Sequence, residues 1–195
     1  MNTLDLIERY YDPGSLALRV LMRHSRLVTQ AAAEIAGRVP YLSPDAAFIY
    51  EAAMLHDIGI LYTNAPEIGC FGKYPYVCHG YLGRKLLEKH GLPDHALVCE
   101  RHVGGGLSAE DIKQQGLDLP VRDMVPETVE EKIICFADSF FSKSPPPEGS
   151  RRSVKEALQW FESLGTDKAE RFRTWLKTFG NPDQLMIQAQ SKSQN

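Results

Sequence analysis

Apolar residues recur roughly every three to four positions along almost the whole chain, and this spacing constrains the fold more than any other feature. No segment shows the sustained alternation of apolar and polar residues that a half-buried strand requires. The pattern therefore predicts an all-α protein. A length of 195 residues suits one domain with one sizeable core, so we expect a single domain over residues 1–195.

Local signals place the first predicted helices. A long helix is expected over about residues 16–39, with one inward stripe made of Val20, His24, Leu27, Ala31 and Ile35. The sequence Ser-Pro-Asp at 43–45 predicts the start of the next helix, because serine caps, proline suits the first helical position and aspartate complements the helix dipole. This helix should end near Gly59. Residues 61–77 are rich in Gly, Pro, Asn and Tyr and predict a long irregular connection.

The rest of the chain is predicted to follow the same plan. Further helices are expected over about residues 79–90 and 93–103, from Pro126 onward, and over 151–163 and 166–179. Residues 104–125 predict a loop with at most a short helix. The helices within 151–179 are amphipathic and are expected to brace the bundle, whereas the polar tail at 188–195 should fray.

Composition excludes several classes of partner. The formal net charge of -3 offers no concentrated basic surface, so neither a nucleic-acid duplex nor a membrane is expected as the main partner. The first residues lack the apolar run of a signal peptide, and no stretch approaches the roughly 20 apolar residues that span a bilayer. The four cysteines form no CxxC pair, which argues against a thiolate metal site. We expect a cytoplasmic protein with reduced cysteines.

The adjacent pair His56 and Asp57 is the main candidate for chemistry. It lies at the end of the apolar segment EAAMLHDIGI, where Ile49, Ala52 and Ala53 share one helical face with His56. A lone histidine on such a face is usually a satisfied core residue. A buried carboxylate beside it, however, carries a desolvation cost that a metal ion or a hydrogen-bonding partner must offset.

Similar groups occur on the other predicted helices. His24 lies on the inward stripe of the first helix, His79 opens the third and His102 closes the fourth. Asp138 shares a face with Ile134 in a later apolar helix. Five helices thus each offer a nitrogen or oxygen ligand near an inward face, which favours one metal site over five unrelated polar residues.

In this order these residues resemble the HD-domain metal-dependent phosphohydrolase superfamily, whose name-giving sequence HDIG stands here at residues 56–59. The resemblance covers roughly residues 16–143, whereas 151–179 match only as generic bundle helices. It implies an HD-domain-like helical bundle with a metal site in its centre. It also implies a phosphohydrolase that acts on a nucleotide or another small phosphate ester through metal-activated water.

The resemblance further implies the ligand set. Residues at the positions of His24, His56, Asp57 and Asp138 bind one ion in that family. Histidines at the positions of His79 and His102 commonly hold a second, with Asp57 bridging and with Asp57 and His56 as the catalytic residues. This sequence has a single histidine in RHVGGG where some relatives have a pair, which puts the second ion in question. Imidazole and carboxylate ligands suit Fe, Mn, Co, Ni or Zn as divalent cofactors.

Candidate phosphate contacts surround these residues in the sequence. Lys73, Arg101 and Lys143 could each pair with a substrate phosphate, although single basic residues more often lie solvated on the surface. The three glycines at 104–106 would let backbone amides approach an anion. They would equally well end one helix and link it to the next element.

Three other functions remain open at this level. In a one-metal nucleotidase, His79 and His102 would not bind an ion; they would support the ligands of the single ion or contact the substrate. A regulatory HD module would bind a nucleotide without cleaving it, although Asp57 and Asp138 are both present. A mixed-valent di-iron pair would instead support oxidation of a diol, as some HD proteins do.

Overall fold

The computed structural model describes residues 3–143 and 151–182, and helices dominate this part of the chain, which confirms the all-α prediction. The α-helices are α1 (Thr3–Glu8), α2 (Leu16–Arg38), α3 (Ala46–Leu55), α4 (His79–Lys89), α5 (Pro93–Arg101), α6 (Ala109–Gln114), α7 (Val129–Asp138), α8 (Val154–Leu164) and α9 (Thr166–Phe179). Short 3-10 turns are η1 (Pro40–Leu42), η2 (Ile58–Tyr62), η3 (Pro66–Ile68), η4 (Tyr76–Cys78) and η5 (Val103–Gly105). The predicted frayed tail at 188–195 lies outside the described residues.

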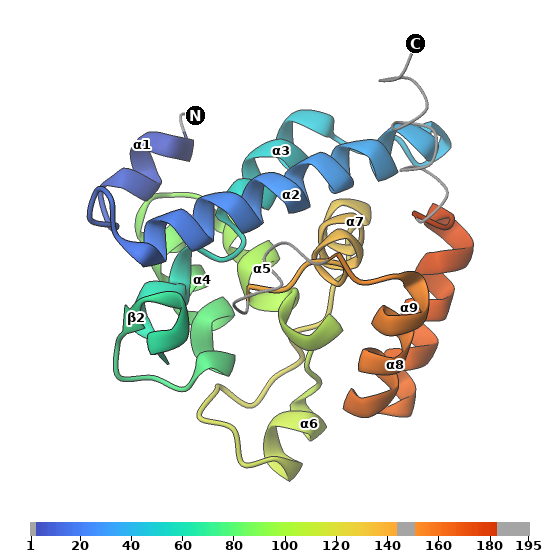
Figure 1. Ribbon diagram of the computed structural model, residues 1–195. Coiled ribbons are helices and arrows are strands. Elements are labelled where there is room, and N and C mark those ends of the chain that lie inside the picture. Colours follow the sequence, from blue (N-terminus) through green and yellow to red (C-terminus); the bar gives the residue numbers. More distant parts are fainter. Residues whose placement is uncertain (1–2, 144–150, 183–195) are drawn as a thin grey trace.

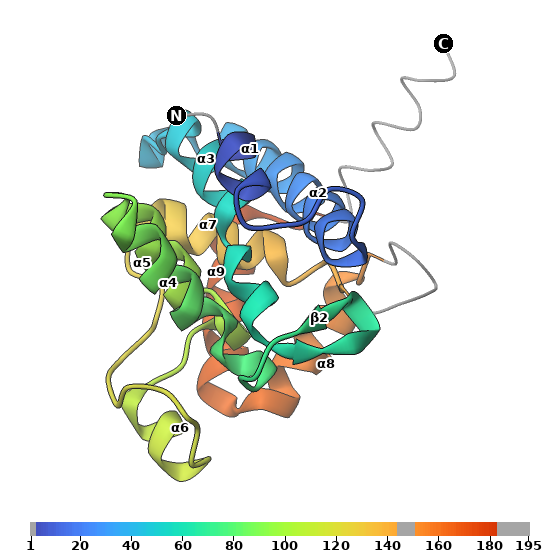
Figure 2. The ribbon, with the colours of Figure 1, turned by 90° about the vertical axis from the view of Figure 1, so that its left-hand side faces the viewer.

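The long helix α2 runs across one side of the molecule, with α3 alongside it and with α4, α5, α7, α8 and α9 below it in Figure 1. α3 and α7 both contact α2, and α7 also contacts α3, α5 and α9, so α7 lies near the centre of the bundle. α4 and α5 form one antiparallel pair, and α8 and α9 form another at the end away from α1. The turned view in Figure 2 shows α6 at the periphery, below α4 and α5.

Two large apolar clusters make up most of the core, and a third, small one lies around Leu107, Ile112 and Met124. One large cluster contains the C-terminal half of α2 with α3, α7, α8 and α9, and includes Phe136, Phe161 and Phe172. The other large cluster contains α1, the N-terminal half of α2, the end of α3, and α4 and α5. Along α2 the first cluster begins at Val28 and the second ends at Leu21, so buried His24 lies between them.

The start of α3 differs from the sequence prediction. Ser43 adopts a left-handed conformation, with φ 50°, and its amide closes η1 by donating to the Pro40 carbonyl. The cap is Asp45, whose side chain accepts from the Phe48 amide at 2.9 Å. The helix therefore begins at Ala46, because the chain must first turn at Ser43 before it can enter a right-handed helix.

The end of α3 also differs, and the difference matters for the site. The helix stops at Leu55 rather than near Gly59, and Asp57 already has the non-helical angles φ -107° and ψ 8°. Gly59 lies in η2 against α4, where an added Cβ would meet the His79 carbonyl oxygen at 2.2 Å and the Gly83 amide nitrogen at 2.4 Å. Glycine is thus required here for close packing, not to end the helix.

Two smaller predictions are also corrected. α7 begins at Val129 rather than Pro126, because Thr128 and Glu131 form a capping box at its start. In α2, Val20, Leu27 and Ala31 are only half-buried, whereas Leu21 and Val28 are fully buried. Because α3 and α7 both pack against α2, its buried face is broader than the predicted stripe and lies to one side of it.

The predicted connection at 61–77 is irregular but ordered by backbone hydrogen bonds. Its strands β1 (Asn64–Ala65) and β2 (Cys70–Phe71) pair antiparallel, with Asn64 opposite Phe71 and Ala65 opposite Cys70. The amide of Asn64 also donates to the Tyr74 carbonyl at 2.8 Å. Across the described residues, 3–143 and 151–182, no helix has the length and apolar character needed to cross a membrane.

Candidate metal centre

The first group of candidate ligands joins three helices at the boundary of the two apolar clusters. It consists of His24 from the middle of α2, His56 and Asp57 from the end of α3, and Asp138, the last residue of α7. His24 Nε2 lies 3.1 Å from Asp57 Oδ2 and 2.8 Å from Asp138 Oδ1. His56 Nε2 lies 3.1 Å and 3.5 Å from the same two oxygens. These four donor atoms face one point.

The second group shares Asp57 with the first. His79, the first residue of α4, and His102, immediately after α5, place their Nε2 atoms 3.3 Å and 3.4 Å from Asp57 Oδ1. The two Nε2 atoms lie 3.1 Å apart. Asp57 therefore presents Oδ2 to one group and Oδ1 to the other, which is the arrangement of a carboxylate that bridges two cations.

The other nitrogen of three of these rings sets the tautomer. His56 Nδ1 lies 2.7 Å from the Ala53 carbonyl, His79 Nδ1 2.6 Å from the Tyr76 carbonyl, and His102 Nδ1 2.7 Å from the Cys99 carbonyl. A carbonyl oxygen only accepts, so each Nδ1 carries a proton and donates it. In a neutral ring this leaves a lone pair on Nε2 facing the cluster, which is the form that binds a metal.

The carboxylates provide the test of whether a cation fits here. The Lys143 ammonium lies 2.6 Å from Oδ2 of the fully buried Asp57, whereas Asp57 Oδ1 and Asp138 Oδ1 have no hydrogen-bond partner. A buried carboxylate without hydrogen bonds is costly unless a cation offsets its charge. Lone pairs of Nε2 and carboxylate oxygens that converge on common points meet this condition best with metal ions. The donor set suits a divalent transition metal.

The charges in the cluster shift its protonation. Burial alone would raise the pKa of Asp57, but the charges of His56 and Lys143 outweigh burial, so this pKa lies well below its usual value. Burial opposes the charged form of His56, yet Asp57 and Asp138 beside it raise the pKa of His56 to about 10. Burial lowers the pKa of His79 to about 3, so this ring is neutral near pH 7 and keeps its lone pair.

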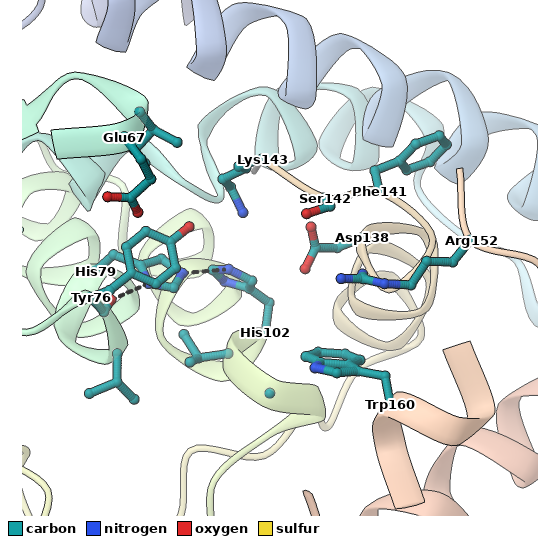
Figure 3. Close-up of a pocket in the computed structure, with 14 residues that line it drawn as sticks. Glu67, Tyr76, His79, His102, Asp138, Phe141, Ser142, Lys143, Arg152 and Trp160 are labelled. Carbon is teal, nitrogen blue, oxygen red and sulfur yellow. Dashed lines mark hydrogen bonds between the residues drawn. The ribbon is translucent and has the colours of Figure 1, made fainter. Parts of the chain in front are cut away.

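A cavity of about 460 Å³ opens on one side of the candidate ligands (Figure 3). His79, His102 and Asp138 line it, whereas His24, His56 and Asp57 do not. Its volume lies within the range of small-molecule sites in proteins. A bound molecule would thus meet the second group and the Asp138 edge of the first, while the pair at 56–57 lies behind them.

Of the three cations predicted from the sequence to contact phosphate, Lys143 lines this cavity. Its Nζ lies 2.6 Å from Asp57 Oδ2, and although burial disfavours the charged form, the neighbouring Asp57 raises the pKa of Lys143 above its usual value. Arg101 lies outside the cavity lining and forms ion pairs with Glu131 at 2.9 Å and Glu127 at 3.1 Å. Lys73 is exposed, 5.2 Å from the centre of the Tyr74 ring, and also lies outside the lining.

Several cavity residues were not predicted from the sequence, and two of them come from α8 and the segment just before it. Arg152, just before α8, and Trp160, within α8, form the wall opposite His79 (Figure 3). In the sequence, α8 has the pattern of an ordinary amphipathic helix, and no local signal indicates that it borders the cavity.

The three glycines at 104–106 form a turn that α8 packs against. The amides of Gly105 and Gly106 donate to the carbonyls of His102 and Val103. An added Cβ at Gly105 would lie 2.2 Å from the Phe161 ring. These contacts favour the structural reading of the glycines: they end the segment that carries His102 and let α8 approach closely.

The family follows from comparison with known proteins. Residues 21–142 match the model of the HD domain family, and this chain belongs to that family. The match spans all six candidate ligands and ends before α8. The expectation of an HD-type helical bundle with a histidine and aspartate cluster in its centre is confirmed.

Two curated relatives carry the name tRNA (cytidine(56)-2'-O)-methyltransferase. The protein of Picrophilus torridus is 34% identical over 124 residues, which are 63% of this chain and 32% of the relative. The protein of Thermoplasma volcanium is 29% identical over 170 residues, which are 86% of this chain and 43% of the relative. This chain therefore spans less than half the length of either relative.

Solved structures with a similar fold include the HD domain of the L. monocytogenes phosphodiesterase PgpH. The TM-score is 0.50 for one structure of this domain and 0.51 for its complex with cyclic-di-AMP, each at 13% identity. The similarity covers 90% of this chain and 95% and 94% of the two PgpH chains. At this identity the similarity establishes the shared fold.

Proposed function

We propose that this protein is a metal-dependent phosphohydrolase that acts on a nucleotide or another small phosphate ester. One observation carries the proposal: the buried Asp57 carboxylate lies between two groups of imidazole nitrogens, beside a cavity large enough for a small molecule. The positively charged Lys143 lines that cavity and favours an anionic substrate. Membership of the HD family supports the same class of reaction.

We assign two divalent ions to the two groups. His24, His56, Asp57 and Asp138 would hold one ion, and Asp57, His79 and His102 would hold the other. Ions in such a site supply Lewis acidity, because they lower the pKa of water and offset the charge that develops on phosphoryl oxygens. Under this assignment Asp57 and His56 contribute to catalysis by holding the ions and do not contact the substrate, since neither residue lines the cavity.

The protein's own groups would orient the substrate. With the Asp57 charge balanced by ions, the Lys143 ammonium is left to pair with a substrate phosphate at the edge of the cavity. The Nδ1 hydrogen bonds hold the imidazoles of His79 and His102 in fixed orientations. The chemistry thus needs no serine or cysteine nucleophile.

A role connected with tRNA is the second candidate, because two relatives are named as tRNA methyltransferases. Residues 21–142 are the HD part of this chain, and an alignment over 86% of the chain must include most of them. More than half of that relative lies outside the match, so its name describes a longer protein. We therefore propose phosphoester hydrolysis for this chain, and a substrate derived from tRNA would be compatible with it.

The test is a panel of phosphomonoesters, phosphodiesters and dinucleoside polyphosphates, assayed with the metals that copurify. We expect turnover of at least one class, and loss of that turnover in Asp57→Asn, which keeps the shape of the side chain but removes its charge. Tight binding of a nucleotide that is recovered unchanged would instead indicate the sensing module. No turnover by fully metal-loaded protein would contradict the proposal. Methyl transfer to tRNA by this chain alone would favour the second candidate.

A further inference from the structure

Arg152 and Trp160 lie outside the part of the chain that matches the HD family, yet they line the cavity beside Asp138. We propose that these two residues select a nucleotide as the substrate: Arg152 binds its phosphate together with Lys143, and Trp160 stacks on its base. This inference rests on the proposed function and names the substrate class of the same site. It assigns a binding role to helix α8, which the sequence suggested only as a brace.

The place of Arg152 in the cavity supports the phosphate contact. One guanidinium nitrogen, Nη1, donates to the Ser139 carbonyl at 3.1 Å, and the Arg152 amide donates to the Phe140 carbonyl at 2.8 Å. Glu156 lies close enough to interact with the charge of Arg152, but among the described residues no carboxylate lies within ion-pair distance of it. Figure 3 shows the guanidinium pointing into the cavity between Asp138 and Trp160. Its other N–H groups are therefore placed to donate to an anion.

Lys143 provides a second cation in the wall of the cavity. Both Lys143 and Arg152 line it, with Asp138 between them in Figure 3. The two cations approach a bound anion from different directions, close to the candidate metal ligands. A phosphate held between them would lie where the proposed reaction takes place.

Trp160 offers an aromatic surface next to Arg152. The residue is half-buried, and the centre of its ring lies 5.2 Å from the Arg152 guanidinium carbon, which lies over the ring. The Trp160 and Phe161 rings meet edge to face at an interplanar angle of 75°. Nucleobases stack on such rings whatever their identity, because every base has a π-face. A polar end with two cations and an aromatic end together match a nucleotide better than a sugar phosphate or inorganic phosphate.

The packing of α8 fixes this aromatic wall. Phe161 is fully buried and lies so close to Gly105 that no side chain fits there. Arg171 from α9 donates to the Gly105 carbonyl at 2.6 Å and to the Gly106 carbonyl at 3.2 Å. Because Gly105 follows His102 by three residues, Trp160 is held at a defined place relative to the candidate metal ligands.

The experiment compares adenosine 5'-monophosphate with ribose 5-phosphate, two phosphate esters that differ by the base. Intrinsic fluorescence reports binding directly, because the chain has two tryptophans and the other, Trp175, is buried in the core at 3% exposure. We expect adenosine 5'-monophosphate to quench the emission and ribose 5-phosphate to leave it unchanged. The quenching should disappear in Trp160→Phe and persist in the matched control Trp175→Phe.

Kinetic constants of variants separate the two roles. Trp160→Leu should raise KM for adenosine 5'-monophosphate by about tenfold or more and leave KM for ribose 5-phosphate unchanged. Trp160→Phe keeps an aromatic ring and the packing, so it should retain most of the affinity for the nucleotide. Arg152→Gln should raise KM for both esters, and Arg152→Lys should restore part of the loss.

Equal KM values for the two esters in the wild-type protein, or no quenching by adenosine 5'-monophosphate, would overturn the inference. So would an equal effect of Trp160→Leu on both esters. Failure of the proposed function looks different: quenching of Trp160 by a nucleotide that is never cleaved would leave the base contact intact and remove the hydrolase. Cleavage of esters without any preference for a base would leave the hydrolase intact and remove the base contact.

Discussion

Asp57 is the residue on which the candidate centre depends. Each of its two oxygens faces a different pair of imidazoles, and the side chain is completely buried. The carboxylate therefore has two roles: it belongs to both ligand groups, and it balances the charges of His56 and Lys143. Residues with one ligand group each, such as His24 and His79, are less central to this arrangement.

The raised pKa of His56 gives a prediction for metal binding. With a pKa of about 10 in the absence of metal, this ring is protonated near pH 7, and it must lose its Nε2 proton before it can coordinate. His79, with a pKa of about 3, is already neutral. Metal affinity should therefore rise with pH between about pH 6 and pH 8, with about one proton released by His56.

Calorimetry in buffers with different ionisation enthalpies measures this release. The dependence of the apparent binding enthalpy on the buffer gives the number of protons, and we expect His56→Ala to lower it. An affinity that falls as the pH rises over this interval would show that the protonated cluster, not the neutral one, accepts the ion.

At the scale of secondary-structure elements, helix ends place most of the candidate ligands. His56 and Asp57 follow α3, Asp138 ends α7, and His79 begins α4. The sequence predicted these helices because their apolar spacing is local information. It misplaced the start of α3 and the start of α7, because a turn at Ser43 and a capping box at Thr128 decide where those helices begin.

The contact between η2 and α4 gives a second prediction. Gly59→Ala would place a methyl group 2.2 Å from the backbone of His79, so α4 must shift. Overpacking against backbone should cost about 1–3 kcal/mol of stability, and the shift should weaken binding at the group that contains His79. Thermal unfolding and metal titration of the variant would measure both effects.

Gly37→Ala is the matched control for this variant. Gly37 lies in α2, and an added Cβ there meets no atom within 4 Å. Alanine is the better helix former, so this change should stabilise the protein by about 0.4–1 kcal/mol. A Gly59→Ala variant as stable as Gly37→Ala would show that the packing of η2 on α4 is looser than described.

At the scale of the whole molecule, the candidate ligands connect α2, α3, α4, α5 and α7 at the boundary of the two apolar clusters. The order of ligands along the chain and the family resemblance were enough to predict this centre. They were not enough to predict Arg152 and Trp160, because the place of α8 depends on contacts of Phe161 with Gly105, far away in sequence. Such packing leaves no periodic signal in α8 itself.

The central position of the ligands predicts a large effect of metal on stability. Ions that bind the folded state at about 100 times their dissociation constant contribute about 2.7 kcal/mol. For a chain of 195 residues this corresponds to an increase in Tm of roughly 5–10 °C. Thermal unfolding with and without a chelator measures it, and an unchanged Tm would argue against metal binding between these helices.

The number of metal ions per chain tests the central claim most directly. Elemental analysis of the purified protein should find about two divalent ions in the wild type, about one in His79→Ala, and few or none in Asp57→Asn. This pattern follows if the two groups share Asp57 and only the second includes His79. A wild-type protein that holds no ion after incubation with these metals, or an Asp57→Asn variant that holds as many as the wild type, would contradict it.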